Sequence, residues 1–402
     1  MHPLENLRVL DLSRALAGPF CTMMLGDLGA EVIKVERPGH GDESRGWGPP
    51  FVGEPYGPYA GESAYFISAN RNKRSVTVNL KSSAGQEIIR RLAQVSDALV
   101  ENFRTGTLDR MGLGYEDLRV LNPGLVYCSI SGYGRTGPWA QRPGYDFIIQ
   151  AEGGLMGITG PQEGLPYRVG VPIVDITAGM FAATAILGAL RARDETGEGQ
   201  IVDVSLLDSS AALLTNVASN FLVGGEPSRR LGNAHPNIAP YEAFHARDRW
   251  FALAAANQGQ WARLCEVIER PALRDDPRFN TNEARVSNRP ALLETLGEVF
   301  AERDATEWLA ALRESGLPCA PINTVAEVFA HPQAEARELE LETEHPTVGP
   351  VRFPGFPYKL SQTPAEVRQP PPTLGQHTEE VLRELLGYSP SEVAEMRESG
   401  AI

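Results

Sequence analysis

One aspartate, Asp175, stands alone in an apolar stretch of small and aliphatic residues, VGVPIVDITAGMFAATAILGAL (169–190). Residues 176–190 are predicted to form a helix, which places this carboxylate at the start of the helix. Asp175 is then either a helix cap, a position that aspartate favours, or a reactive group. The two interpretations are compatible, because a helix N-terminus favours an ionised carboxylate and an ionised carboxylate is a nucleophile.

Basic residues recur where predicted strands end. Arg37 follows the predicted strand 30–36, Lys81 follows 75–80, and Arg104 and Arg110 follow the strand that starts at residue 97. Open α/β sheets bind ligands outside the carboxyl ends of their strands. In a chain of net charge −14, this recurrence favours a local polyanion site, although each cation taken singly is more typical of a solvated surface than of a ligand contact.

Other kinds of site lack their sequence signatures. The cysteines, at positions 21, 128, 265 and 319, form no CxxC pair, so neither a zinc site nor a disulfide framework is indicated. The Gly18-Pro19 turn after the first strand lacks the glycine pattern of a dinucleotide site. No metal is therefore expected.

Composition limits the class of protein. A chain of 402 residues that is 42% hydrophobic is expected to contain more than one core, and its acidic charge argues against a general nucleic-acid surface. The N-terminal MHPLENLRV has no apolar signal core, and the uncharged apolar stretch 176–190 is shorter than the roughly 20 residues of a membrane span. We expect a cytoplasmic protein that binds neither nucleic acid nor membranes.

Strands and helices are predicted to alternate along the first part of the chain. The predicted strands are 8–13, 30–36, 75–80, 97–103 and 125–131, and the helices between them include 19–29 and 82–96. This alternation predicts an α/β fold with a parallel sheet covered by helices. Further helices are expected at 176–193, 259–269, 290–301, 305–315 and 378–400, with a short strand followed by a helix within 201–222 and a strand at 250–256.

A set of ordered motifs resembles the class III CoA-transferases, also called the CaiB/BaiF or formyl-CoA transferase family. The motifs are LDLSRALAGPFCTMMLGDLGAEVIKVERPGHGD (10–42), NRNKRSVTVNLKS (70–82), VENFRTGTLDRMGLGYEDL (100–118), SGYGRTGPWAQRPGYDFIIQAEGGLMGITG (131–160), VDITAGMFAATAILGAL (174–190) and GQIVDVSLLDSSAALL (199–214). LGNAHPNIAPYEAF (231–244) and PPPTLGQHTEEVL (370–382) extend the match toward the C-terminus.

The resemblance implies a large Rossmann-like domain with a parallel sheet, a small α+β domain, and an interlocked homodimer. The corresponding division is 1–200 for the first part of the large domain, 201–224 for a helical connection, 225–325 for the small domain, and 326–402 for the return to the large domain.

The resemblance also implies a reaction. The aspartate in the position of Asp175 is the family's covalent nucleophile, which forms an anhydride with the acyl group of an acyl-CoA and then an aspartyl-CoA thioester. No tightly bound cofactor is implied, since coenzyme A arrives and leaves as part of the substrates.

Further residues match the family's contacts with CoA and with the reacting group. The CoA contacts fall on Leu16, Ala17, Arg37, Val78, Asn79, Leu80, Lys81, Asn102, Phe103, Arg104 and Arg110, and Tyr145 and Asp146 match the thioester end. The loop that covers the aspartate in some members matches 254–261, where Asn257, Gln258 and Gly259 are expected to support the reaction.

Within the family, the closest likeness is to the branch that uses succinyl-CoA and dicarboxylic acceptors such as glutarate, hydroxymethylglutarate, itaconate or mesaconate. A second acceptor carboxylate needs a cation, for which Arg45, Arg71 and Arg168 are candidates.

Three alternatives remain open from the sequence. An α-methylacyl-CoA racemase is disfavoured because Tyr145 stands where the racemase branch carries histidine. A non-catalytic acyl-CoA-binding protein would share the same motifs. A nicotinamide dehydrogenase is suggested only by the strand–helix alternation, and the missing glycine fingerprint argues against it.

Overall fold

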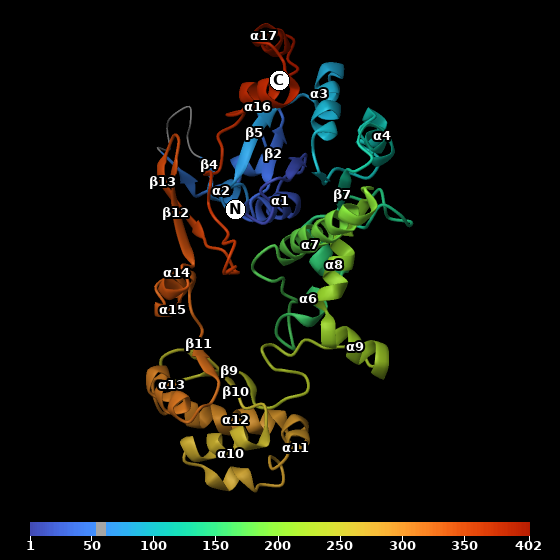
Figure 1. Cartoon of the computed structure of the whole chain (residues 1–402). Helices are drawn as coiled ribbons and strands as arrows, with labels where there is room; N and C mark the ends of the chain where they lie inside the picture. The colour runs from blue at the N-terminus through green and yellow to red at the C-terminus, as the bar shows by residue number, and fades with distance from the viewer. Residues whose placement is uncertain (54–61) are drawn as a thin grey trace. The chain divides into compact units, whose positions relative to one another are not determined.

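The computed structural model describes residues 1–53 and 62–402, which form two compact units (Figure 1). The first unit comprises Met1–Leu155, Val169–Ala218 and Gln333–Ile402, and the second comprises Met156–Arg168 and Ser219–Pro332. Residues 156–168 were expected in the large domain. They belong to the second unit because Arg230 donates hydrogen bonds to the carbonyls of Pro161 (3.0 Å) and Gly164 (2.9 Å).

A parallel sheet of six strands forms the centre of the first unit, in the order β5-β2-β1-β6-β7-β8. The strands are β1 (Arg8–Asp11), β2 (Glu31–Glu36), β5 (Lys73–Thr77), β6 (Ala98–Glu101), β7 (Val126–Ser131) and β8 (Ile201–Ser205). The predicted α/β class and parallel sheet are confirmed. The third strand starts at Lys73, earlier than predicted, because the buried Lys73 ammonium pairs with the Asp11 carboxylate at 3.1 Å.

Helices cover both faces of this sheet, since successive strand residues point to opposite faces. Val9 packs in one hydrophobic layer with helices α1 (Ala17–Asp27) and α7 (Ile173–Thr196), and Leu10 packs in the other with α3 (Ser83–Gln94). Further helices of the first unit are α2 (Ala64–Ile67), α4 (Tyr115–Leu121), α5 (Asp146–Glu152), α8 (Leu206–Leu213), α16 (Thr378–Leu386) and α17 (Pro390–Glu398). Three helices have residues in both units: α6 (Leu155–Ile158), α9 (Thr215–Gly224) and α15 (Pro332–Ala336).

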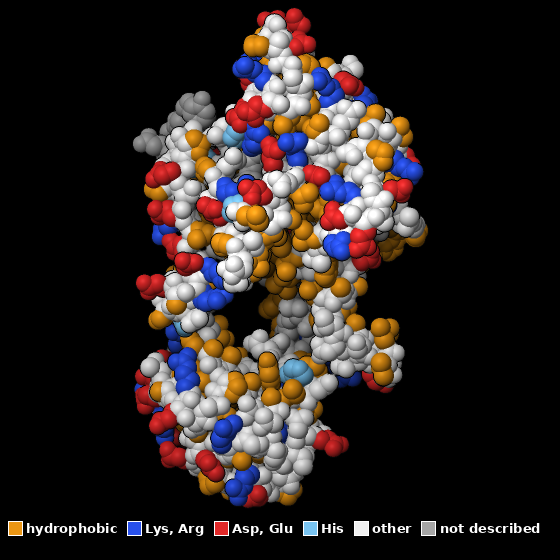
Figure 2. All heavy atoms as spheres, in the orientation of Figure 1, with side chains coloured by type: hydrophobic (Ala, Val, Ile, Leu, Met, Phe, Trp, Pro, Cys, Tyr) orange, Lys and Arg blue, Asp and Glu red, His pale blue; other side chains and the backbone are white. Residues whose placement is uncertain are grey.

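Helices α1 and α7 pack unusually closely. A Cβ atom at Gly179 on α7 would lie 2.6 Å from the carbonyl oxygen of Ala17 on α1, so only glycine fits there. Figure 2 shows hydrophobic side chains gathered on the part of the first unit that these helices occupy in Figure 1. With 24 residues and a mean hydropathy of 1.8 in its most apolar window, α7 is long and apolar enough to span a membrane. Half of that window is buried inside the protein, so length and composition are weak evidence for a span.

The C-terminal segment returns to the first unit and pairs with it through Asn72. The Asn72 side chain donates to the Glu366 carbonyl (2.9 Å) and accepts from the backbone N–H groups of Arg368 (2.7 Å) and Gln369 (3.0 Å). A hairpin of β12 (Glu340–His345) and β13 (Gly349–Pro354) precedes this contact. A two-stranded pairing of β3 (Phe51–Val52) and β4 (Glu62–Ser63) also belongs to this unit.

The single helix predicted at 378–400 is two helices, α16 and α17. Gly387 ends α16 in the left-handed conformation (φ 71°), and Ser389 caps α17 with Pro390 in its first turn. A glycine after one helix and a Ser-Pro pair at the start of the next are strong stop and start signals.

The second unit has its own hydrophobic core. A three-stranded antiparallel sheet in the order β11-β10-β9 comprises β9 (Tyr241–His245), β10 (Trp250–Ala254) and β11 (Cys319–Pro321). The helices are α10 (Gln258–Val267), α11 (Asn282–Ser287), α12 (Arg289–Phe300), α13 (Ala305–Glu314) and α14 (Val325–Phe329).

We predict that Asp27→Ala destabilises the first unit by about 3–5 kcal/mol, because it leaves the buried Arg71 guanidinium without its bidentate partner (2.6 and 2.9 Å). Arg191→Ala is the matched control, since it removes an exposed ion pair with Glu195 and should change stability by less than about 1 kcal/mol. Urea denaturation of both variants measures the difference. Equal destabilisation by the two substitutions would contradict this account.

Candidate functional site

Two cavities lie at the carboxyl ends of the sheet strands, where open α/β sheets bind ligands. The first, of about 340 Å³, is lined by Asp175 and by residues that follow β1, β6 and β7; we call it the Asp175 cavity. The second, of about 510 Å³, is lined by Arg37 and by residues that follow β1, β2 and β5; we call it the Arg37 cavity.

Asp175 lies in the first turn of α7 and does not cap it. The N-cap residue is Pro172, which has no side-chain acceptor. The acceptor comes from another helix, α5, where the Asp146 carboxylate accepts the N–H groups of Val174 (2.8 Å) and Asp175 (3.3 Å). Asp146 thus caps α7, the helix that carries Asp175, although it lies on α5 itself.

Gln150, one turn further along α5, holds the Asp146 carboxylate in place. Its amide nitrogen donates to Asp146 Oδ2 at 2.7 Å, and its amide oxygen accepts the N–H of Val169 at 2.8 Å. Both side chains are buried. The chain entering α7 is therefore fixed to α5 at two points.

Burial, and then the charge of Asp146, raise the pKa of Asp175 to about 7. The expectation that the helix N-terminus keeps this carboxylate strongly ionised is wrong. The N–H groups at the start of α7 are bonded to Asp146, which also brings a negative charge close to Asp175. Near neutral pH both protonation states of Asp175 are populated, which is typical of a functional carboxylate.

Tyr145 and two aromatic residues that the sequence analysis missed, Trp47 and Tyr65, lie in or next to the lining of the Asp175 cavity. Tyr145 and Trp47 line the Asp175 cavity, and Tyr65 stacks edge-on against Trp47 with ring centroids 5.0 Å apart. Burial, and then the charge of Asp175, raise the pKa of Tyr65 to about 12. Its phenol is therefore a permanent O–H donor within electrostatic reach of Asp175.

The Arg37 cavity has the composition of a polyanion site. Arg37 and Lys81 line it and are exposed, and Val78, Asn79 and Leu80 line it beside them. All of these positions were predicted as ligand contacts.

A buried carboxylate, Asp42, fixes the loops around both cavities. It accepts hydrogen bonds from Lys34 Nζ (2.8 Å) and from the N–H groups of Ala15 (3.1 Å) and Ser44 (2.9 Å). Burial alone would raise the pKa of Asp42, but the Lys34 ammonium and the hydrogen bonds lower this pKa to about 2. Ala15 has a φ of 65°, a left-handed conformation that is costly for alanine, and the hydrogen bond to Asp42 offsets that strain.

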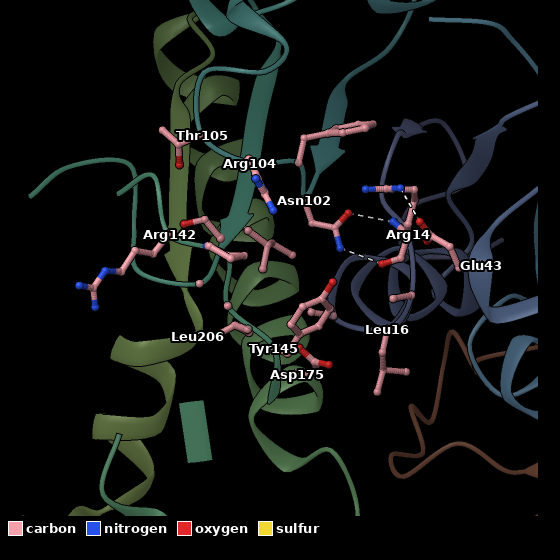
Figure 3. Close-up of a pocket in the computed structure, with 18 of the residues that line it drawn as sticks. Arg14, Leu16, Glu43, Asn102, Arg104, Thr105, Arg142, Tyr145, Asp175 and Leu206 are labelled. Atoms are coloured by element: carbon pink, nitrogen blue, oxygen red, sulfur yellow. Dashed lines mark hydrogen bonds and ion pairs between the residues drawn. The ribbon is translucent and has the colours of Figure 1, made fainter. Parts of the chain in front are cut away.

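Asn102 joins the loops after β1 and β6. Its amide oxygen accepts the Arg14 N–H at 2.9 Å, and its amide nitrogen donates to the Arg14 carbonyl at 2.7 Å (Figure 3). Asn102 was predicted to contact CoA. It lines the Asp175 cavity, as that prediction requires, and it also positions the Arg14 backbone.

A model of the CoA-transferase family III matches residues 4–378. The chain therefore belongs to CoA-transferase family III. It is 47% identical to a succinyl-CoA:glutarate CoA-transferase of Mus musculus over 402 residues, which cover 100% of this chain and 91% of the mouse protein. It is 45% identical to a succinate–glutarate CoA-transferase of Agrobacterium fabrum, covering 95% of this chain and 96% of that protein.

A solved structure agrees with the family assignment. A CaiB/BaiF family protein from Brucella suis superposes with a TM-score of 0.85 at 42% identity, covering 96% of this chain and 99% of that one. The resemblance to the class III CoA-transferases is thus confirmed, both for the enzyme family and for the fold.

Most predicted CoA contacts of this class III CoA-transferase line one of the two cavities. Leu16, Ala17 and Arg104 line the Asp175 cavity, and Phe103 lines both. Arg110 lines neither, because its guanidinium turns to Thr107 Oγ1 at 3.3 Å.

The three arginines expected to bind a second acceptor carboxylate are placed elsewhere. Arg45 pairs with Glu36 at 2.7 Å and with Glu62, and Arg71 is buried against Asp27. Neither lines a cavity, because each guanidinium neutralises a carboxylate of the scaffold. Arg168 is an exposed residue of the second unit.

Asn257, Gln258 and Gly259 lie in the second unit at the start of α10. Asn257 is the N-cap, accepting the Gln260 N–H at 2.9 Å. Gln258 donates to the Asn280 carbonyl at 2.7 Å and accepts from Arg285 at 3.2 Å. The structure gives both amides a local stabilising role within that unit.

Sequence reasoning missed Arg14, Glu43, Trp47 and Arg142, which line the Asp175 cavity. Arg14 follows the first strand, so the rule that selected Arg37 would have found it. In Figure 3, Arg142 points away from Asp175, and it stacks on Trp139 with 4.3 Å to the ring centroid. Within residues 1–53 and 62–402, no group of three or more His, Cys, Asp or Glu is placed to hold a metal ion.

We predict that Asp146→Asn lowers the pKa of Asp175 below 7. The asparagine keeps an oxygen acceptor for the Val174 N–H but removes the charge that disfavours ionisation of Asp175. Carbon-13 NMR titration of the aspartate carboxyls, assigned with Asp175→Asn, measures the shift. The control is Asp194→Asn, on the exposed far end of the same helix, which should leave the pKa of Asp175 unchanged. An unchanged Asp175 pKa in Asp146→Asn would refute the electrostatic coupling.

Proposed function

We propose that this class III CoA-transferase moves CoA from an acyl-CoA to a carboxylic acid through covalent catalysis by Asp175. The main support is the half-buried Asp175 carboxylate, which has a pKa of about 7 and lines one cavity. This cavity shares residues with a second cavity that is lined by exposed cations. A reacting thioester and a polyanionic carrier fit such a pair of cavities.

In the first half-reaction, an oxygen of ionised Asp175 attacks the thioester carbonyl carbon. The carbon–sulfur bond breaks, CoA leaves as a thiolate, and Asp175 forms a mixed anhydride with the donor acyl group. The thiolate then attacks the aspartyl carbonyl of the anhydride. This step releases the donor acid as a carboxylate and leaves an aspartyl-CoA thioester.

The second half-reaction is the reverse with a different acid. The acceptor carboxylate attacks the aspartyl thioester, releasing CoA thiolate and forming a new anhydride. The thiolate attacks the acceptor acyl carbon, which yields the product acyl-CoA and regenerates the Asp175 carboxylate. Every step exchanges a carboxylate and a thiolate, so no redox or hydrolytic co-reactant is required. The Tyr65 phenol is a candidate hydrogen-bond donor to the oxyanion formed at Asp175.

Coenzyme A is proposed to place its adenosine and 3′-phosphate in the Arg37 cavity and its thioester in the Asp175 cavity. Arg37 and Lys81 supply positive charge in the former, with Val78 and Leu80 as apolar wall. Leu16 and Ala17 form the wall beside Asp175 in the latter.

We propose succinyl-CoA as donor and a dicarboxylate as acceptor, with glutarate the first acid to test. The support is the activity named for the mouse and Agrobacterium relatives. Itaconate, mesaconate and hydroxymethylglutarate are further candidates.

The proposed enzyme is a cytoplasmic homodimer without a tightly bound cofactor, and acts on neither membranes nor nucleic acids. Exposed apolar side chains support the dimer: Phe147 and Ile148 on α5, and Met180 and Phe181 on α7, are 43–54% exposed. Large apolar side chains on neighbouring helices are typical of protein–protein contacts.

We predict that Asp175→Ala lowers succinyl-CoA:glutarate transfer by at least roughly a thousandfold, because the nucleophile is lost, while CoA binding persists. Peptide mass spectrometry of the wild type with succinyl-CoA alone should find a hydroxylamine-sensitive adduct at Asp175. Asp175→Asn, which keeps the side-chain volume, should form none.

Other results would point to other functions. Undiminished transfer by Asp175→Ala would sink the mechanism. CoA binding with no turnover and no adduct would indicate an acyl-CoA-binding protein. Deuterium wash-in at the α-carbon without acyl exchange would indicate a racemase.

We predict that log(kcat/KM) rises with pH at a slope of one and levels off near pH 7. Below its pKa Asp175 is protonated and cannot attack, and above it the carboxylate is free to react. Steady-state rates from pH 5.5 to 8.5 measure the profile. The break should move to lower pH in Asp146→Asn; a break that stays in place would assign it to another group.

A further inference from the structure

The two cavities meet at three residues, Arg14, Glu43 and Phe103, which line both. Arg14 Nη1 lies 2.6 Å from Glu43 Oε1, and the guanidinium carbon lies 5.1 Å from the centroid of the Phe103 ring. Figure 3 shows the Arg14–Glu43 pair beside Asn102. This ion pair therefore joins the loop after β1 to η1 (Glu43–Gly46) across the boundary between the cavities.

The backbone on both sides of the pair is fixed, whereas the ion pair itself is weakly held. Asn102 holds the Arg14 backbone at two points, and Asp42 caps η1 by accepting the Ser44 N–H. The Arg14 and Glu43 side chains are 45% and 51% exposed. Exposed ion pairs contribute about 0–1 kcal/mol, so a better partner for either side chain can separate them.

Among the described residues that line both cavities, Glu43 is the one carboxylate, and its partner Arg14 is half exposed. The other acids lining the Arg37 cavity are engaged, Glu36 by Arg45 at 2.7 Å and Asp42 by Lys34 at 2.8 Å. Glu43 thus competes with any anion that approaches Arg14.

We propose that the Arg14–Glu43 ion pair is an exchangeable latch between the cavities, in which the diphosphate of coenzyme A displaces the Glu43 carboxylate and takes Arg14 as its partner. This inference rests on the proposed function, because a molecule with adenosine in one cavity and its thioester in the other must cross the boundary. The diphosphate lies between those two parts of CoA. It carries more charge than a carboxylate and offers several oxygens to the planar guanidinium.

The latch lowers the affinity for CoA, since Glu43 must be displaced at each binding event, and it assists product release for the same reason. Removing Glu43 should therefore tighten binding, whereas removing Arg14 should weaken it. The effect is confined to ligands that carry the diphosphate.

Isothermal titration calorimetry with coenzyme A and with pantetheine, which lacks phosphate, tests the latch. Glu43→Gln should bind CoA about three- to tenfold more tightly and pantetheine equally well. Arg14→Ala should weaken CoA binding, and the gain from Glu43→Gln should shrink in the Arg14→Ala background. Glu87→Gln, which removes the same charge from an exposed pair with Arg90, should leave CoA binding unchanged.

The outcomes separate the latch from the proposed function. Wild-type protein that fails to bind CoA would overturn both. Wild-type protein that binds CoA and transfers it, while Glu43→Gln binds CoA no more tightly, would overturn the latch alone. If Glu43→Gln increased CoA affinity equally in the wild-type and Arg14→Ala backgrounds, Glu43 would act only by general charge repulsion. That result would also overturn the latch.

Discussion

The arrangement of both cavities depends on one buried carboxylate, Asp42. It binds the Lys34 ammonium of β2 and two backbone N–H groups, those of Ala15 and Ser44, from loops that follow different strands. A buried ion pair contributes little net stability, because desolvation of the two charges offsets their attraction. Its effect is geometric: it holds Ala15 in a left-handed conformation and so sets the direction in which the chain enters α1.

Asp42, Asp146 and Asp175 show how partners decide what a carboxylate does. Asp42 has a cation and Asp146 has the N–H groups of α7 and Gln150, so both are committed to holding the backbone. Among residues 1–53 and 62–402 Asp175 receives neither, and its neighbour is another negative charge. The same residue type serves as scaffold where it is paired and has a raised pKa, suited to the proposed reaction, where it is not.

Features that depend on neighbouring residues in the sequence could be predicted, whereas contacts between segments far apart in the sequence could not. Arg37 and Lys81 were predicted because a strand end fixes the position of the residue that follows it. The role of Asp146 as the cap of α7 could not be predicted, because the Val174 N–H that it accepts lies 28 residues away in sequence. Arg45 and Arg71 were misassigned because their partners come from other elements, Glu36 in β2 and Asp27 in α1. Cation positions can be predicted from local pattern, whereas their neutralisation is a property of the tertiary fold.

The close contact at Gly179 gives the Asp175 cavity a determinant outside its own lining. Gly179 lies one helical turn beyond Asp175 and touches the backbone of α1, whose N-cap Leu16 and first residue Ala17 line the same cavity. The spacing between the two helices therefore affects the width of the Asp175 cavity. A side chain as small as a methyl group at position 179 would push the helices apart and widen that cavity, so its size depends on a residue outside its lining.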